Sequence, residues 1–169
     1  FEDSYSHVVD EAYINQIEFK TKTFKLFFSK IRQYLKHDND ILEIGSYYGI
    51  LGNIIKPHVK SYMGLELSKH ATRYSKKKFN LNIINQSLKE FSKNEFRFDV
   101  IIMTDVIEHL DKPFETLNLI QKNLKPNGIL VLSTFNIDSI VPRVMRSKYY
   151  WIIPMHKYYF SNSTLKYFL

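Results

Sequence analysis

A glycine-containing loop and a carboxylate beyond it are the first residues whose types and spacing suit chemistry. The loop spans residues 43–52 and reads EIGSYYGILG. Glycines there let the backbone turn sharply and let a ligand approach the main chain. Glu66 stands 21 residues after Gly45, and a carboxylate at that spacing can accept hydrogen bonds from both hydroxyls of a ribose. The loop and the carboxylate together indicate a site for a ligand that contains a ribose.

The spacing of the glycines narrows the kind of ligand. A dinucleotide fingerprint reads GxGxxG, but Tyr47 stands at the position of its second glycine and crowds the space that a pyrophosphate needs. A GxxxxGK[ST] loop for a nucleoside triphosphate is also absent from the sequence. The pattern therefore favours a ligand with a ribose and no cluster of phosphates, and it argues against an NAD-dependent oxidoreductase.

A second group of polar residues follows a strongly apolar run at residues 98–103. Asp105, Glu108 and His109 lie in the segment DVIEHL, at residues 105–110. Two carboxylates and an imidazole suit Mg²⁺, Mn²⁺ or Zn²⁺. A histidine also has a pKa close to that of an effective general base. Three roles stay open for this group: binding of a divalent metal, proton transfer by His109, and positioning of a cofactor and a substrate.

Short apolar runs alternate with helical patterns along the middle of the chain. The runs predict strands at residues 41–44, 62–65, 81–85, 98–103 and 129–133, with a turn at 125–128. Helices are predicted at residues 11–36, 50–56, 68–79 and 113–124. This alternation indicates an α/β fold with a parallel sheet and helices on both of its faces. In such sheets ligands bind beyond the carboxyl ends of the strands, where both groups of polar residues lie.

Composition excludes several classes of protein. The chain has 169 residues, 44% hydrophobic and 24% charged, as in an ordinary globular domain. It has no cysteine, which excludes a disulfide scaffold, a thiolate metal site and a cysteine nucleophile. The net charge of +7 favours acidic partners, although we attribute most of it to solvated helix faces. The sequence has no apolar run long enough to span a membrane and no signal-peptide pattern at its start, so the chain is expected to be soluble and cytoplasmic.

These motifs, in this order, resemble those of the class I S-adenosylmethionine-dependent methyltransferases over about residues 38–169. The similarity rests on ExGxxxG at 43–49, Glu66, DVIEHL at 105–110 and LKPNG at 124–128. The small-molecule group that includes the ubiquinone-biosynthesis O-methyltransferases is the most similar. The resemblance implies a Rossmann-like three-layer sandwich with a mostly parallel central sheet. It also implies methyl transfer from S-adenosylmethionine to an oxygen or nitrogen of a small-molecule acceptor.

The resemblance implies a role for each matching position. Glu43 would fix the loop or meet the methionine amino group through water, and Glu66 would hold the ribose hydroxyls. His109 would be the catalytic base, although some relatives bind a divalent metal at Asp105, Glu108 and His109. The other implied cofactor-binding residues are Gly45, Ser46, Tyr47 and Gly49 in the loop, Leu67, Ser87 and Leu88 around the adenine, and Thr104, Asp105 and Val106 after the fourth strand. Tyr47 replaces a glycine of the family, and Ser87 stands where an aspartate is frequent.

The sequence divides into three expected parts. Residues 1–37 form a helical segment that packs on the core, residues 38–136 form the cofactor-binding core, and residues 137–169 form a lid over the substrate. The family completes its sheet with an antiparallel hairpin of two further strands, and this sequence stops before them. Since both ends of the sequence look cut, we expect either a longer protein or an incomplete sheet whose edge a partner covers.

The third part interleaves basic and aromatic residues, a pattern that also suits nucleic acid or a membrane surface. These residues are Arg143, Arg146, Lys148, Tyr149, Tyr150, Trp151, Lys157, Tyr158, Tyr159 and Phe160. His156, in the same part, could face the substrate. A non-catalytic scaffold with this fold and a nucleic-acid methyltransferase stay open as other functions, and the sequence does not indicate an oligomeric state.

Overall fold

Five parallel strands form the centre of the computed structural model, which describes residues 13, 15–150 and 152–169. Their order across the sheet is β3-β2-β1-β4-β5. The strands are β1 (Asp40–Ile44), β2 (Ser61–Leu65), β3 (Ile83–Ile84), β4 (Phe98–Thr104) and β5 (Leu124–Ser133). The order reverses between β1 and β4, so the carboxyl ends of these two strands flank the crevice where such sheets bind ligands. The predicted α/β fold with a parallel sheet is confirmed.

The strands follow the apolar runs of the sequence closely. β1 and β4 consist mostly of buried aliphatic residues, since helices cover both faces of the sheet. β3 is shorter than its predicted range of 81–85. The predicted turn at 125–128 lies inside β5 as an irregularity, because Phe98 pairs with Leu124 while Val100 pairs with Ile129. Asn127, in this irregularity, has a positive φ of 61°.

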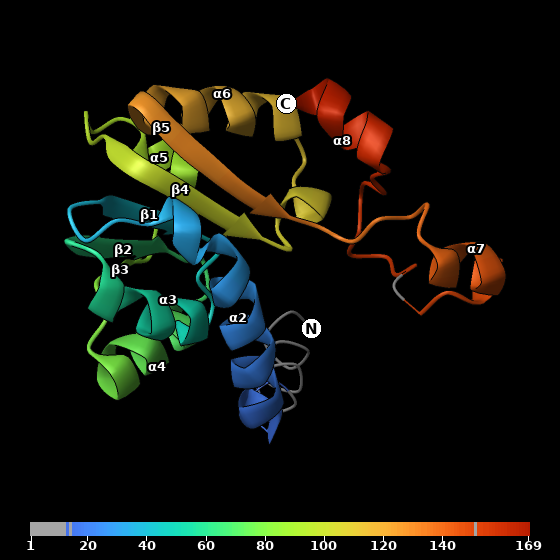
Figure 1. Cartoon of the computed structure of the whole chain (residues 1–169), viewed down its shortest axis with the longest axis horizontal. Coiled ribbons are helices and arrows are strands. Elements are labelled where there is room, and N and C mark those ends of the chain that lie inside the picture. Colours follow the sequence, from blue (N-terminus) through green and yellow to red (C-terminus); the bar gives the residue numbers. More distant parts are fainter. Residues whose placement is uncertain (1–12, 14, 151) are drawn as a thin grey trace.

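Helices pack on both faces of the sheet, which makes three layers (Figure 1). One face carries α2 (Ile17–Ile31), α3 (Ile50–Ile55) and α4 (Lys69–Phe79), and the other carries α5 (Leu88–Phe91) and α6 (Pro113–Asn123). Each face has its own apolar core. Ile31, Leu51 and Ile55 belong to the first core, whereas Phe91 and Ile120 belong to the second.

Local signals explain where several helices begin and end. The hydroxyl of Ser68 accepts the backbone N–H of Ala71 at the start of α4, and Asn80 ends the helix with a left-handed backbone conformation. Pro113 occupies the first turn of α6, as the sequence indicated. α2 is shorter than the predicted 11–36, and the 3₁₀ turn Arg32–Tyr34 follows it. Residues 11, 12 and 14 of that predicted helix lie outside the described residues.

The segment that follows β5 first runs away from the sheet and then comes back to pack beside α6. It carries α7 (Ile140–Met145), the 3₁₀ turn Arg146–Lys148 and α8 (Asn162–Phe168). The N–H of Ile137 donates to the carbonyl of Phe160 at 2.9 Å, and the ring of Phe168 stacks on Phe114 of α6 at 4.1 Å. α8 therefore lies beside α6, while α7 stands on an arm, residues 137–160, that projects from the body (Figure 1). No strand follows β5 within residues 134–150 and 152–169.

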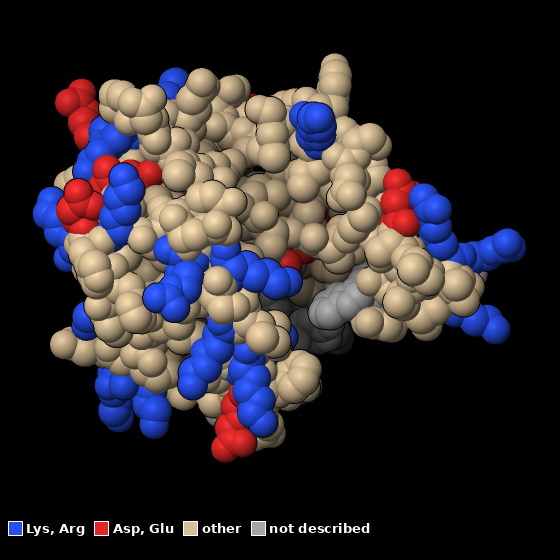
Figure 2. All heavy atoms as spheres, viewed as in Figure 1, with Lys and Arg blue, Asp and Glu red and all other residues tan. Residues whose placement is uncertain are grey.

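The surface carries its positive charge in a dispersed form. On the face drawn in Figure 2, lysine and arginine side chains extend from several elements and from the tip of the arm, with acidic side chains among them. Within the described part of the chain, no helix is both long enough and apolar enough to cross a membrane.

Candidate active site

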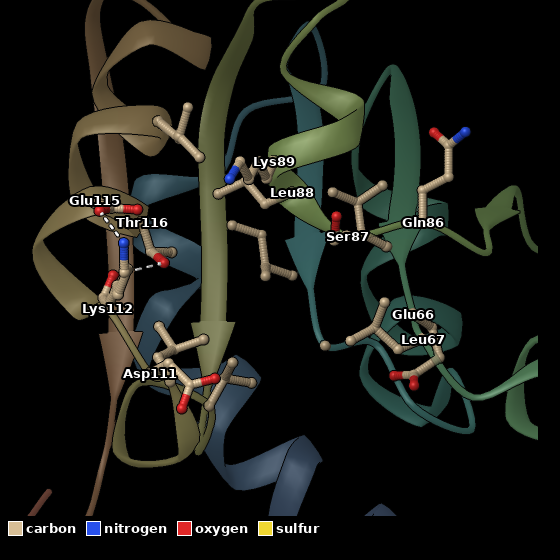
Figure 3. Close-up of a pocket in the computed structure, with 16 residues that line it drawn as sticks. Glu66, Leu67, Gln86, Ser87, Leu88, Lys89, Asp111, Lys112, Glu115 and Thr116 are labelled. Carbon is tan, nitrogen blue, oxygen red and sulfur yellow. Dashed lines mark hydrogen bonds and ion pairs between the residues drawn. The ribbon is translucent and has the colours of Figure 1, made fainter. Parts of the chain in front are cut away.

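A cavity of about 460 Å³ opens at the carboxyl ends of β1, β2 and β4 (Figure 3). Its size is within the usual range for a small-molecule site. Six of the residues predicted to bind a cofactor line it: Gly45, Glu66, Leu67, Ser87, Leu88 and Val106. Asp111, Lys112, Glu115 and Thr116 line the opposite side, where Lys112 forms an ion pair with Glu115 at 2.7 Å. We call this space the cofactor-side cavity.

Glu66 joins the glycine loop to the segment after β2. Its Oε2 accepts the backbone N–H of Tyr47 at 2.8 Å, and its Oε1 accepts that of Ser68 at 2.7 Å. The amide of Asn85 donates to the carbonyls of both Glu66 and Leu67, each at 2.8 Å. An ionised carboxylate offers about four acceptor positions, so one such group can accept main-chain N–H groups and ribose hydroxyls together. The side chain is fixed in place before any ligand arrives.

The glycine loop is tight because neighbouring side chains fill the space beside it. Gly45 has a φ of +73°, and a Cβ atom there would lie 2.5 Å from Cγ2 of Val106. The backbone N–H groups of Gly45 and Ser46 both donate to the carbonyl of Leu65, at 2.9 and 3.1 Å. Gly49 also has a φ of +73°, and its missing Cβ leaves room for Ser75 and Leu81. Gly45 thus lines the cavity, whereas Gly49 allows packing behind the loop.

Tyr47 is accommodated through a left-handed backbone conformation, with a φ of +44°. This conformation lets its N–H reach Glu66, and its half-buried ring packs against Tyr48 with centroids 4.6 Å apart. Tyr47, which replaces the family's glycine, is therefore held by both its backbone hydrogen bond and its ring contact.

Glu43 lies beneath the loop, outside the residues that line the cavity. It is 2% exposed, and its Oε2 accepts the hydroxyl of Tyr62 at 2.5 Å. The pKa of Glu43 is raised to about 8, mainly by burial; the Tyr62 hydrogen bond opposes this rise, and the charge of Glu66 adds to it. This position suits anchoring of the loop, which was one of the two roles predicted for Glu43.

The start of α5 forms the wall expected to meet an adenine. The Ser87 hydroxyl accepts the Glu90 N–H at 3.2 Å, and Oε2 of Glu90 accepts the Ser87 N–H at 3.0 Å, which is a capping box. The Ser87 hydroxyl also donates to Oε2 of Glu90 at 2.8 Å. Leu88 is buried, while Leu67 is 71% exposed and presents apolar surface to the cavity. Two leucines around an open space suit a flat aromatic ring. The hydroxyl of Ser87, in contrast, is already used to stabilise the start of α5.

A second cavity, of about 250 Å³, lies on the other side of the turn after β4. Asp105, Glu108 and His109 line it from that turn, Thr134 and Phe135 from the end of β5, and His156 from the arm. The ring of His156 stacks on Phe135 at 5.0 Å and meets His109 edge-on at 4.7 Å. We call this space the acceptor-side cavity. Thr104, the last residue of β4, lines neither cavity.

The hydrogen bond of His109 defines which nitrogen can act as a base. Its Nδ1 lies 3.0 Å from the carbonyl oxygen of Met155. A carbonyl only accepts, so Nδ1 carries the proton, and Nε2 of the neutral ring is the nitrogen that can take up another. The arm therefore orients and polarises His109.

The two carboxyls that line the acceptor-side cavity, Asp105 and Glu108, both have a raised pKa. The pKa of Glu108 is raised mainly by burial and further by the charge of Asp105. Asp105 is exposed as a residue, but protein atoms crowd its carboxyl, and this desolvation raises its pKa. The Ser133 hydroxyl and the positive charges of Lys20 and nearby histidines act against that rise. No hydrogen-bond partner meets Oε2 of Glu108 within the described residues.

The ligand atoms of Glu108, His109 and His156 lie within 4.8 Å of one another, close enough to hold one metal ion. The sequence suggested Asp105, Glu108 and His109 for this role. Asp105 lines the same cavity, and the structure adds His156 because the arm folds back over the turn after β4.

Tyr13 and Lys20 are site residues that the sequence reasoning missed. Burial, and then the charges of Glu43, Asp105 and Glu66, raise the pKa of Tyr13, so its phenol lies near the ends of three strands. The ammonium of Lys20 lies 5.2 Å from the centre of the Tyr13 ring. Both residues belong to the helical N-terminal region, more than 20 residues before the loop, where no motif marks them.

The strand order, the glycine loop after β1 and the carboxylate of Glu66 after β2 agree with the class I fold of S-adenosylmethionine-dependent methyltransferases. The family model described as "Methyltransferase domain" matches residues 16–169. The chain belongs to this methyltransferase family.

Curated relatives include ubiquinone biosynthesis O-methyltransferases. That of Rickettsia canadensis is 29% identical over 117 residues, covering 63% of this chain and 49% of the relative. The mitochondrial one of Schizosaccharomyces pombe is 33% identical over 103 residues, covering 57% and 38% respectively. The chain spans half or less of the length of these relatives.

Solved structures share the fold. A methyltransferase from Archaeoglobus fulgidus described as SAM-dependent superposes with a TM-score of 0.75 at 21% identity, covering 93% of this chain and 71% of that protein. The plantazolicin methyltransferase BpumL, solved with a monoazolic desmethylPZN analog and SAH, also gives a TM-score of 0.75 at 21% identity, covering 100% of this chain and 70% of that protein.

Proposed function

We propose that this chain is an S-adenosylmethionine-dependent methyltransferase domain that methylates an oxygen or nitrogen of a small molecule. One observation carries the proposal: the turn after β4 separates a cavity that contains Glu66 from a cavity that contains His109. A methyl donor in the first cavity and an acceptor in the second would meet at that turn. The names of the curated relatives, which are O-methyltransferases, support the reaction class.

The cofactor-side cavity fits the donor part by part. Of the residues that line it, Glu66 would accept hydrogen bonds from the ribose hydroxyls, Leu67 and Leu88 would contact the adenine, and Gly45 and Val106 would lie toward the methionine end. Asp105 lies beside the cofactor in this proposal, while Glu43 and Ser46 hold the loop from beneath. When bound, S-adenosylmethionine supplies an electrophilic methyl group on a positively charged sulfur.

The acceptor-side cavity aligns the nucleophile and removes its proton. As the acceptor oxygen or nitrogen gains the methyl group, Nε2 of His109 takes the proton that it loses. Phe135 and His156 give the cavity flat ring surfaces that exclude water and fix the direction of attack. The arm is the lid in this proposal, within the segment 137–169 that the sequence analysis assigned to it. Lys157 and Tyr158 donate their N–H groups to the Glu108 carbonyl at 2.8 and 3.2 Å, which ties the arm to this turn.

A divalent ion is a second candidate for the role of Glu108, His109 and His156, favoured by their ligand atoms lying within 4.8 Å. Two imidazoles and a carboxylate fit Zn²⁺ or Mn²⁺, which would bind acceptor oxygens and lower the pKa of a hydroxyl. Titration of the chain with Mn²⁺, with Glu108→Gln as the matched variant, separates the two roles. If the three residues form a metal site, the parent chain should bind Mn²⁺ and Glu108→Gln should lose that binding. If His109 is a base without a metal, neither protein should bind Mn²⁺.

Calorimetric titration with S-adenosylmethionine and S-adenosylhomocysteine tests the proposed cofactor, with NADH and ATP as controls. Binding of the two sulfur ligands alone, at micromolar concentrations, supports the proposal. Binding of none favours a non-catalytic scaffold, and salt-dependent binding to RNA or DNA would favour a nucleic-acid methyltransferase. The part boundaries at 37 and 136 and the cytoplasmic location stay predictions, which limited proteolysis and cell fractionation test.

A further inference from the structure

Exposed apolar side chains gather on α7, the helix of the arm. Ile140 is 80% exposed, Val144 is 76% exposed and Val141 is 50% exposed. Helical spacing places these three on one side of α7, whereas Pro142 is buried on the other. The arm exposes three further large apolar residues, Tyr150, Ile152 and Met155. Single exposed apolar residues are common, but a group of them marks a surface that contacts a partner or a membrane.

Basic side chains accompany this apolar group. Between residues 137 and 160 the sequence has four basic residues and one acidic residue, Asp138, so the arm carries a net charge of +3. Arg143, Arg146 and Lys148 are exposed in or directly after α7. Figure 2 shows basic side chains at the tip of the arm with uncharged surface beside them. The arm thus combines aliphatic surface with positive charge.

The kinds of side chain on α7 favour a membrane over the other occupants of such a surface. Nucleic-acid bases stack on aromatic rings, whereas the most exposed residues of α7 are aliphatic. A second copy of the chain would bring another arm with a net charge of +3 against the first, and like charges would oppose that pairing. In a bilayer, aliphatic side chains enter the boundary of the hydrocarbon, and neighbouring arginine and lysine side chains are attracted to anionic headgroups.

The arm also connects this surface to the acceptor-side cavity. Met155 is exposed on the arm, and its carbonyl holds Nδ1 of His109 at 3.0 Å. The next residue, His156, lines the cavity itself. A bilayer in contact with the arm would therefore lie close to the acceptor-side cavity.

We propose that α7 and the basic residues around it bind the surface of a membrane that contains anionic lipids. Ile140, Val141 and Val144 enter the bilayer at the headgroup boundary, and Arg143 and Lys148 contact the headgroups. Such binding is reversible, because one short apolar face inserts far less surface than a helix that spans the bilayer. The inference goes beyond the proposed function and requires neither the donor nor the acceptor.

Co-sedimentation of the whole chain with lipid vesicles tests this surface. The chain should bind vesicles of phosphatidylcholine mixed with phosphatidylglycerol about tenfold or more tightly than vesicles of phosphatidylcholine alone, and high salt should weaken the binding. Ile140→Ser combined with Val144→Ser removes the most exposed apolar side chains and should weaken binding about tenfold or more. The matched control is Phe19→Ser combined with Leu26→Ser on α2, away from the arm, where the side chains are 69% and 67% exposed (Figure 1). This control should bind as the parent does.

A second pair of variants tests the charge. Arg143→Gln combined with Lys148→Gln should weaken binding to the anionic vesicles about fivefold for each residue. Lys76→Gln combined with Lys77→Gln changes two exposed basic residues of α4 and is the matched control. It should change the binding much less, because α4 lies on the body of the molecule (Figure 1).

A parent chain that does not bind the anionic vesicles would overturn the proposal, and so would equal losses in the arm variants and their controls. Salt-dependent binding of an RNA or DNA oligonucleotide that only the arm variants lose, without vesicle binding, would make the arm a nucleic-acid surface instead. Self-association in sedimentation velocity that only the serine variant of the arm loses, again without vesicle binding, would identify a second copy as the occupant. Thermal unfolding of each variant checks that it folds. None of these results bears on the proposed function, since the vesicle assay contains neither donor nor acceptor.

Discussion

The two cavities are built in different ways. In the cofactor-side cavity, Glu66 and Gly45 come from loops directly after neighbouring strands, and backbone hydrogen bonds hold them. In the acceptor-side cavity, His109 depends on Met155, which lies 46 residues away on the arm. The first cavity is therefore fixed by the sheet itself, while the second is completed by residues of the arm. Changes in the first should alter affinity for the donor, and changes in the second should alter the rate.

Glu66→Ala should have the largest effect and should act on affinity and stability together. The variant removes the proposed ribose acceptor and leaves the N–H groups of Tyr47 and Ser68 without it. Loss of charge-assisted hydrogen bonds at a buried carboxylate should cost about 2–4 kcal/mol of binding, roughly a 30- to 1,000-fold loss of donor affinity. Calorimetry with S-adenosylmethionine and urea unfolding measure the two losses. An unchanged affinity would remove Glu66 from the donor site.

His109→Asn should change the rate and leave the donor affinity alone. Asparagine can keep a donor near Nδ1, for the carbonyl of Met155, and it lacks Nε2. We expect kcat to fall about 100-fold or more, the usual contribution of a general base. Single-turnover kinetics and calorimetry on the same preparation measure both quantities. His109→Gln, which keeps a polar group near Nε2 without a basic nitrogen, is the control and should be equally slow. A full rate in either variant would exclude the base role.

The contrast between the two cavities also explains which features could be predicted from the sequence. The five strands were recognisable because a strand buried on both faces is a continuous apolar run, and Glu66 because its spacing from Gly45 is local. The short α5, the irregularity inside β5 and the backbone conformation of Tyr47 depend on packing that no single motif records. The grouping of His156 with Glu108 and His109 depends on the path of the arm, and Tyr13 reaches the site only through the packing of the N-terminal region on the sheet.

Glu43→Gln should change how stability depends on pH. Burial raises the Glu43 pKa from 4.5 to about 8, so the folded chain holds a proton there that the unfolded chain has already released. Stability should therefore be highest near pH 5 and should fall as the pH rises toward 8, by up to about 1.4 kcal/mol per pH unit. Urea unfolding at several pH values measures the slope.

The glutamine variant can still accept the Tyr62 hydroxyl and has no proton to lose, so its slope between pH 5 and 8 should be flatter. Glu108, which lines the acceptor-side cavity, is a matched residue, because its pKa is also raised by burial. Glu108→Gln should flatten the slope as well, over a window that starts at the same pH. A parent chain whose stability rises with pH across this window would contradict the account of both carboxyls.

Ser87→Ala should have the smallest effect and should act on stability alone. The sequence suggested that Ser87 meets the adenine, whereas its hydroxyl caps α5 through Glu90. Loss of such a cap costs about 0.5–2 kcal/mol, and a helix of four residues should lie at the low end. Ser87→Asn, another good capping residue, should restore most of the stability. Donor affinity should stay within about twofold in both variants, because the leucines and Glu66 supply the recognition. A tenfold loss of affinity in Ser87→Ala without loss of stability would instead place the hydroxyl on the adenine, and the two cavities would then differ less in how far the sequence predicts them.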